Sequence, residues 1–286
     1  GLPENQTSYI TGEFTGTLVG AEGSKAYAIY DLKKPLFDTL KNATVKDLDL
    51  KNTQVDSKEN AAAVAKTANN ATISNVAVEG KVSGRKSVAG LVVDATNTRI
   101  ENSSFSGKLV ANHADNNANY AGGIVGKLTG GNAKVDKSKV DAVISTAARN
   151  NNQTAGGIAG KLENGALVTR SVTTGKILNG QGYPRVGGIV GSTYLRGRVD
   201  NVVSNMNVGD GYATTGDQFG IADVKNAITY VENKKQDNFV RKVTKEEADA
   251  KIASYGITVT LDDTGQDLKA NSKEVNYTTL SQAQAE

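Results

Sequence analysis

The stretch YAGGIVGKLTGG, residues 120–131, has the residue types of a glycine-rich phosphate-binding loop. Gly126 and Lys127 could place backbone N–H groups and an ammonium around a phosphate. A nucleotide-binding loop of this kind also needs an earlier glycine, a Ser or Thr after the lysine, and a helix that follows. Here Ala121 and Leu128 occupy those two positions, and no helical periodicity follows. The stretch therefore does not predict a nucleotide site.

Other groups that could do chemistry are few. The only histidine, His113, lies in a polar, asparagine-rich stretch and cannot supply a His-Glu-x-x-His zinc motif. The chain has no cysteine, which excludes disulfides, thiolate metal sites and a cysteine nucleophile. The acidic pair Asp262–Asp263 is typical of a turn. The pair Glu246–Glu247 suits the first turn of a helix, where the helix dipole favours negative charge.

Composition favours short strands joined by tight turns. The chain has 286 residues, with 31 glycines, 3 prolines, 5% aromatic residues and no tryptophan. The net charge of +3 is spread without a polybasic patch, so nucleic-acid and membrane-surface binding are not expected. No apolar run is long enough for a membrane span, and no signal peptide opens the chain. Because it begins at Gly1, we expect an excised part of a longer protein.

The glycine-rich stretch recurs, as TAGGIAGKLE and then RVGGIVGS. The equivalent positions are Ala63, Gly90, Gly123, Gly157 and Gly188, which are 27, 33, 34 and 31 residues apart. Each unit has a small-Gly-aliphatic piece, then a short alternating run, and often a third run after a glycine. A fixed period of about thirty residues is typical of a solenoid, in which neighbouring units bury a shared core.

We therefore predict an all-β fold, a parallel β-helix of six or seven coils, right-handed because parallel crossovers favour that hand. Equivalent side chains should stack into ladders, with Ile124 over Ile158 over Ile189 and Leu91 ahead of them. The motif glycines should lie where coils turn sharply or approach closely, since glycine has no Cβ.

Two regions are expected. Residues 1–217 form the β-helix, with an N-terminal starting coil at about 9–40 that carries bulky apolar side chains. Residues 218–286 form a small α+β C-terminal cap and a linker towards a missing downstream region. Thr244 and Glu247 predict a capping box before a short helix that ends at Gly256, and the stretch ITVTL that follows resembles a strand.

The repeats differ in length mainly at 111–119, 147–153, 179–185 and 209–216, which predicts loops on one face, often the binding face of a solenoid. Tyrosine and arginine dominate interface anchors. The partner-binding candidates near these loops are Tyr183, Arg185, Tyr194, Arg196 and Arg198.

Many β-helices are carbohydrate-active enzymes that gather acids on one sheet face, so this function is one alternative. The acids Asp136, Asp141, Glu163 and Asp200 are not expected to stack at equivalent positions. A passive, adhesin-like surface spacer is a further alternative.

At its GGIVG, GGIAG and GGIVG repeats the chain resembles the GLUG-type repeats of the streptococcal immunoglobulin A protease and related surface zinc metalloproteases. GEFTGTLVG followed by IYDLKKPLFDTLKNATVKDLDL resembles the opening of that region. EVNYTTLSQAQAE is similar to the segment that leads towards the protease portion. The resemblance covers nearly the whole chain, although GLUG repeats also occur in other bacterial surface proteins.

The resemblance implies a non-catalytic module of an extracellular, cell-wall-associated zinc endopeptidase that cleaves immunoglobulin A. The module would assist substrate binding, gating or domain positioning. It implies no catalytic, cofactor or metal residue in this chain, because the zinc motif would lie in the protease region of the parent. The expected partners are immunoglobulin A, the catalytic region of the parent, or both, and the module is expected to be a monomer.

Overall fold

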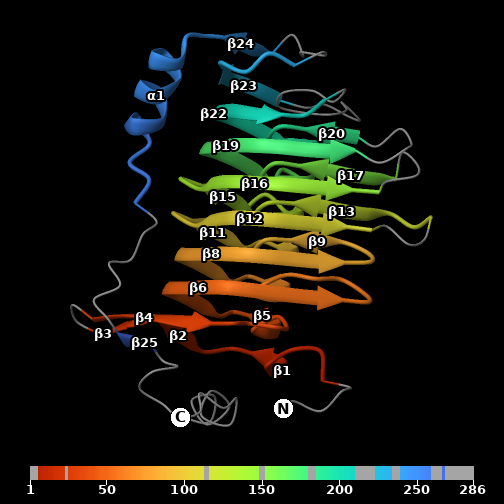
Figure 1. Cartoon of the computed structure of the whole chain (residues 1–286), viewed down its shortest axis with the longest axis vertical. Coiled ribbons are helices and arrows are strands. Elements are labelled where there is room, and N and C mark those ends of the chain that lie inside the picture. Colours follow the sequence, from red (N-terminus) through yellow and green to blue (C-terminus); the bar gives the residue numbers. More distant parts are fainter. Residues whose placement is uncertain are drawn as a thin grey trace.

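The computed structural model describes residues 6–22, 25–112, 116–147, 152–179, 185–209, 223–233, 239–258 and 266–267. The chain winds into a parallel β-solenoid of about six turns with about 31 residues in each coil. The coils stack along one axis, so that strands of successive coils lie side by side (Figure 1). The predicted parallel β-helix is confirmed.

Three sheets form the walls, and most strands pair in parallel with the equivalent strand of the next coil. The seven-stranded sheet contains, in spatial order, β1 Ile10–Phe14, β5 Phe37–Lys41, β7 Ala65–Asn69, β10 Val92–Thr96, β14 Val125–Thr129, β18 Ala159–Glu163 and β21 Val190–Tyr194. The four-stranded sheet contains β9 Val88–Ala89, β13 Asn119–Gly122, β17 Gln153–Gly156 and β20 Arg185–Gly187.

The fourteen-stranded sheet forms the longest wall. Its strands are β2 Thr17–Val19, β3 Ala21–Glu22, β4 Lys25–Tyr30, β6 Thr44–Ser57, β8 Thr72–Gly84, β11 Arg99–Glu101, β12 Ser104–Ala111, β15 Lys134–Asp136, β16 Lys139–Thr146, β19 Leu167–Asn179, β22 Arg198–Asn207, β23 Asp223–Thr229, β24 Val240–Lys242 and β25 Gln266–Asp267. In β8 and β19 the second and third runs of the sequence repeat join into one long strand.

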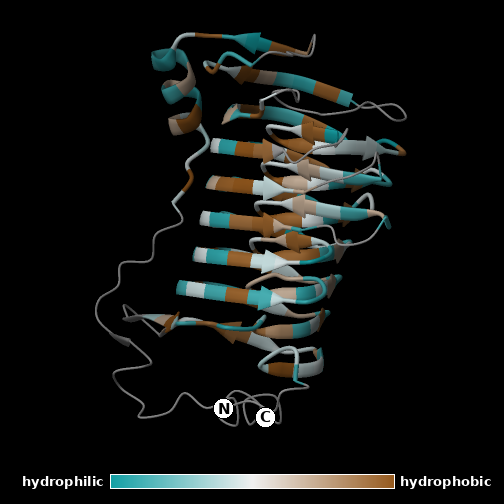
Figure 2. Ribbon diagram, turned by 45° about the vertical axis from the view of Figure 1, so that its right-hand side comes forward, coloured by the Kyte–Doolittle hydropathy of each residue, from teal (hydrophilic) through white to brown (hydrophobic). Residues whose placement is uncertain are grey.

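The aliphatic ladder is the centre of the core. Leu91, Ile124, Ile158 and Ile189 are fully buried. The backbone N–H of Ile124 donates to the carbonyl of Ile158 at 2.9 Å, and that of Ile158 to the carbonyl of Ile189 at 2.8 Å. Figure 2 shows hydrophobic residues recurring at the same place along the stacked strands. The predicted ladder is confirmed, and each buried aliphatic side chain stabilises the fold by about 1.5–3 kcal/mol.

The last glycine of the second and third GGIxG motifs lets two sheets touch. Gly160 and Gly191 lie in the seven-stranded sheet, next to the backbone of the four-stranded sheet. A Cβ at Gly160 would lie 2.8 Å from the Cβ of Tyr120, and a Cβ at Gly191 would lie 2.8 Å from the amide nitrogen of Ala155. The recurring glycine is thus explained by close approach, as the repeat predicted.

A corner of the coil is made by residues with left-handed backbone. The residues at this position have φ between 41° and 60° and are Asp47, Asn75, Asn102, Lys137, Arg170, Asn201 and Asn226. Asn and Asp tolerate this conformation better than most residues. Just after the corner, the hydroxyl of Ser138 accepts from the N–H of Ser103 at 3.3 Å, and that of Ser171 from the N–H of Ser138 at 3.1 Å. This serine ladder satisfies buried backbone donors.

The helix α1, Lys245–Ser254, follows β24. The hydroxyl of Thr244 accepts from the N–H of Glu247 at 3.2 Å, and Gly256 has φ 63°, so the predicted caps are confirmed. The reciprocal half of a capping box is replaced, because the Glu247 carboxylate pairs with Arg241 at 2.6 Å. The predicted strand ITVTL is wrong at residues 257–258, which are not in a strand, and its other residues lie outside the described ones.

Candidate functional site

The structure brings three of the sequence-predicted residues to one corner. Tyr194 ends β21, Arg196 lies in the turn that follows, and Arg198 begins β22. Tyr194 and the neighbouring Leu195 are 43% and 52% exposed. We call Tyr194, Leu195 and Arg196 the Tyr194 corner. The left-handed backbone of Leu195 and Arg196, with φ 46° and 66°, turns their side chains away from the coil path.

The other two candidates are separate from this corner. Arg185 begins β20 in the four-stranded sheet and is half-buried. Tyr183 lies outside the described residues, as do most residues of the four variable loops. Arg198 donates from its guanidinium to the carbonyl of Gly165 at 3.3 Å, so it also has a structural contact.

Next to the corner, lysines and tyrosines alternate in space. The ammonium of Lys161 lies 5.5 Å from the ring centroid of Tyr194 and 5.7 Å from that of Tyr120. Lys127 lies 5.8 Å from the Tyr120 ring. Cation–π contacts of this kind hold rings in place. We call Tyr120, Lys127, Lys161 and Tyr194 the Tyr–Lys ladder.

Sequence reasoning missed the ladder, although a signal was present. Lys127 and Lys161 follow the last glycine of the GGIxG motif in successive repeats, and the structure pairs them directly. Within the single loop, Lys127 has only the features of a phosphate ligand. Its place in the repeat, rather than in the loop alone, predicts its neighbours.

The ladder is also an electrostatic cluster. Lys161 pairs with Glu163 at 2.6 Å. Burial raises the pKa of Asp94, although the charge of Lys127 lowers it, and the Glu163 charge raises it further. Burial likewise raises the pKa of Tyr120 against the effect of Lys127. Titratable groups with shifted pKa values gather at functional sites more often than elsewhere.

The acids stack more than the sequence indicated. Asp136 and Asp200 occupy one column, with Thr169 between them, and Glu101 precedes Asp136 in the same column. The expectation that the acids avoid equivalent positions was therefore wrong for this pair. The spacing from the motif glycine to the acid differs between coils, from Gly123 to Asp136 and from Gly188 to Asp200, so the glycine period does not reveal this column.

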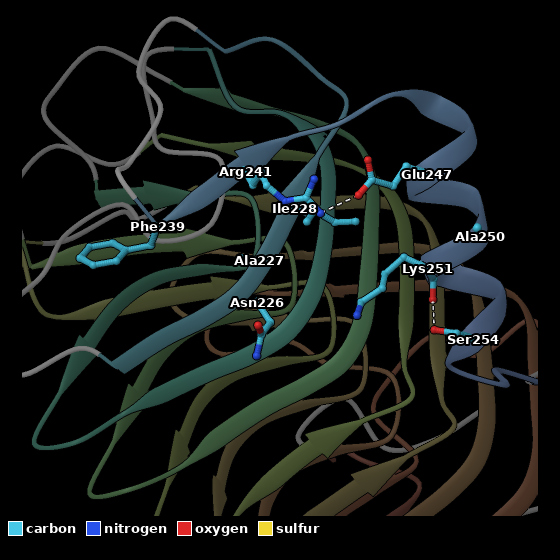
Figure 3. Close-up of a pocket in the computed structure, with 9 residues that line it drawn as sticks. All are labelled: Asn226, Ala227, Ile228, Phe239, Arg241, Glu247, Ala250, Lys251 and Ser254. Atoms are coloured by element: carbon cyan, nitrogen blue, oxygen red, sulfur yellow. Dashed lines mark hydrogen bonds and ion pairs between the residues drawn. The ribbon is translucent and has the colours of Figure 1, made fainter.

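A hollow of about 510 Å³ lies between α1 and the strands β23 and β24. Figure 3 shows Phe239 at one edge of the hollow, Glu247 and Lys251 of α1 at the opposite side, and Arg241 between them. Phe239 is 44% exposed. Arg241 pairs with Glu247 at 2.6 Å, and the hydroxyl of Ser254 donates to the Lys251 carbonyl at 2.6 Å. Several polar groups that line the hollow thus bond to one another.

Comparison with known proteins places this architecture. Residues 1–80 match the family model described as the M26 IgA1-specific Metallo-endopeptidase N-terminal region. The chain is 68% identical over 285 residues to the zinc metalloprotease ZmpC of Streptococcus pneumoniae serotype 4, covering 100% of this chain. It is 42% identical over 254 residues to the immunoglobulin A1 protease of Streptococcus sanguinis, covering 86% of this chain. The chain is a homologue of the N-terminal region of the M26 metallo-endopeptidases.

The homology extends to the fold. A solved structure titled IgA1 Protease superposes with a TM-score of 0.80 at 33% identity, over 91% of this chain and 22% of that one. The chain spans 15% of ZmpC and 13% of the S. sanguinis protease, so it corresponds to a small part of its metalloprotease relatives.

The names of the M26 relatives imply zinc, and the described residues do not fit it. They contain no group of three or more His, Cys, Asp or Glu side chains that could hold a metal ion. His113 lies outside the described residues.

Across the described part of the chain, no helix is long and apolar enough to cross a membrane.

Proposed function

We propose that the chain is a non-catalytic β-helix module of a secreted, cell-wall-associated zinc metalloendopeptidase that cleaves immunoglobulin A. Its relatives include a zinc metalloprotease and immunoglobulin A1 proteases, all streptococcal. Zinc and the catalytic residues would lie in the protease region of the parent. The module would contribute binding energy away from the scissile bond, which helps orient a substrate for the chemical step.

The observation that carries this proposal is the Tyr194 corner. A tyrosine, a leucine and an arginine stand exposed together at the end of a rigid strand. Exposed apolar surface beside arginine is characteristic of the centre of protein interfaces. The Tyr–Lys ladder behind Tyr194 restrains its ring, so that less side-chain entropy is lost on binding. The partner is immunoglobulin A or the catalytic region of the parent.

The test is a cleavage assay with the full-length parent protease. We expect Tyr194→Ala and Arg196→Ala each to lower kcat/KM for immunoglobulin A about tenfold, and to leave cleavage of a short hinge peptide unchanged if the antibody is the partner. Loss with both substrates would identify the catalytic region as the partner. Val19→Ala and Arg99→Ala change exposed residues elsewhere on the solenoid and serve as controls.

Unchanged cleavage of both substrates by the corner variants, and by a parent that lacks the module, would contradict the proposal and favour a passive spacer. Binding of the isolated module to immunoglobulin A, followed through amide resonances, gives a second readout. Depolymerisation of a polysaccharide by the module would instead support the carbohydrate-active alternative.

A further inference from the structure

One outward-facing column of the fourteen-stranded sheet changes from polar to apolar along the solenoid. Paired in register, it runs through Ala77, Ser104, Lys139, Val172, Val203 and Ile228. The last three side chains are buried in one cluster with Ala248 and Tyr255. The helix α1 therefore does not extend the stack of coils. It lies along the side of the sheet, as Figure 1 shows.

After α1 the chain makes a contact with a coil nearer to the N-terminus, between Thr258 and Asn102, which we call the clasp. The side-chain amide of Asn102 donates to the carbonyl of Thr258 at 2.9 Å, and its oxygen accepts from the N–H of Thr258 at 2.9 Å. The two bonds reproduce the pairing that a neighbouring strand would offer. Asn102 lies at the corner between β11 and β12, three strand steps below β22.

The third contact lies at the first coils. In β25, Gln266 and Asp267 pair in parallel with Tyr27 and Ala28 of β4. Figure 1 shows β25 beside β4, at the end of the solenoid where β1 also lies. The helix, the clasp and β25 thus mark a return of the chain from the last coils to the first.

We infer that the module is a projecting arm whose two connections leave from the same end. In the fourteen-stranded sheet, β4 and β23 are seven strand steps apart, which corresponds to roughly 34 Å at about 4.8 Å per step. The first strand, β1, and the last described strand, β25, therefore both lie at the β4 end of the solenoid. That end is the surface for the downstream region of the same protein, and the far coils, with the Tyr194 corner, project away from it.

This arrangement follows from contacts within the chain and does not depend on what the Tyr194 corner binds. The arrangement is incompatible with one role, that of a linear spacer between flanking regions. A solenoid that the chain enters and leaves at one end cannot hold its flanking regions a solenoid length apart. A linear spacer would need its exit beside β23 and β24.

Distances between spin labels test the arm in the 286-residue chain. Because the sequence has no cysteine, introduced pairs label only the intended sites. We expect the pair Asp267→Cys and Gln54→Cys to give a short distance, below about 20 Å, and the pair Asp267→Cys and Lys225→Cys one about 20 Å longer. Equal distances, or a shorter one to Lys225, would overturn the arm. Neither result would affect the cleavage assay, so the two proposals fail separately.

A second pair of variants tests the clasp. Asn102→Asp keeps the acceptor and the left-handed corner but loses the amide donor. We expect it to broaden the short distance distribution while the solenoid keeps its far-ultraviolet circular dichroism. Asn42→Asp is the matched control, since Asn42 also has a left-handed φ of 49° and uses its side-chain oxygen as an acceptor from Asn70. An unchanged distribution in Asn102→Asp would remove the clasp from the proposal.

Discussion

Glu101 stacks directly on Asp136, paired in register between adjacent coils. Two stacked acids could suit glycoside chemistry, but cations flank them. Lys134 lies 3.4 Å from Asp136 and 3.9 Å from Glu101, and Arg170 makes a two-pronged ion pair with Asp136. Burial raises the pKa of Asp136, yet the hydrogen bond and charge of Arg170 outweigh it and hold the pKa below its usual value. A general acid needs the opposite shift.

We expect Arg170→Ala to lower the free energy of unfolding by about 1–2 kcal/mol at pH 7, because the buried Asp136 carboxylate loses its main partner. A lowered carboxyl pKa stabilises the fold above the unfolded value of about 3.9 and loses that contribution as pH falls through the folded value. The difference between variant and wild type should therefore shrink at pH 3. Urea unfolding at both pH values measures it.

Arg99→Ala is the control for that measurement, since Arg99 is exposed on the neighbouring strand β11. It should change stability by less than about 0.5 kcal/mol at either pH. A loss in Arg170→Ala that persists undiminished at pH 3 would mean that Arg170 acts through packing of its side chain rather than through the charge of Asp136.

Gly160→Ala should destabilise the solenoid by about 1–3 kcal/mol. The new Cβ would lie 2.7 Å from the carbonyl oxygen of Gly126 and 2.9 Å from the amide nitrogen of Ala121, so the two sheets would have to separate. Gly131→Ala is the matched control, because nothing lies within 4 Å of a Cβ there. Thermal unfolding of the two variants should differ clearly, and equal midpoints would show that the sheets do not rely on this contact.

The sequence repeat predicts most of the fold. A period of about thirty residues places Leu91 and Ile124 at equivalent positions, and strand pairing between coils then makes their stacking necessary. The same alignment would have predicted the Lys127 and Lys161 pair. Contacts that occur only once along the solenoid have no repeat in the sequence that could predict them. Asn102 and Thr258 are 156 residues apart, and nothing in either local sequence indicates that they meet.

The outer surface was equally hard to predict. In β19, Val172 lies between Ser171 and Thr173, which are polar but buried, and in β22 Val203 follows the buried Val202, so composition does not separate the outward side from the core side. Only the pairing of β16 with β19 shows that they continue a polar column and need a cover. Tyr194 and Arg196 were candidates from their residue types, whereas Leu195 was not, and Leu195 and Arg196 form a left-handed turn that the sequence does not indicate.

Val203→Thr should loosen α1 without disturbing the coils. The change keeps the shape of the side chain but places a hydroxyl under the helix, where the cluster of Ala248 and Tyr255 is apolar. We expect the amide protons of α1 to exchange about tenfold faster, and those of β14 and β18 to keep their rates. Val143→Thr, on the same face but half-exposed and away from the helix, should change neither.

Tyr255→Phe should hold α1 more firmly. Tyr255 is 2% exposed, and its hydroxyl finds no hydrogen-bond partner among the described residues, so removing it should stabilise the fold by up to about 1 kcal/mol.

Burial, and then the charge of Asp200, raise the pKa of Tyr255. A raised phenol pKa stabilises the fold below the unfolded value of about 10 and loses that contribution as pH rises above it. Raising the pH from 8 to 11 should therefore lower the free energy of unfolding of the wild type more than that of the variant. A parallel decrease in the variant would show that this hydroxyl is hydrated. Tyr230→Phe, half-buried in the same cluster, is the control at pH 8 and should change stability by less than about 0.5 kcal/mol.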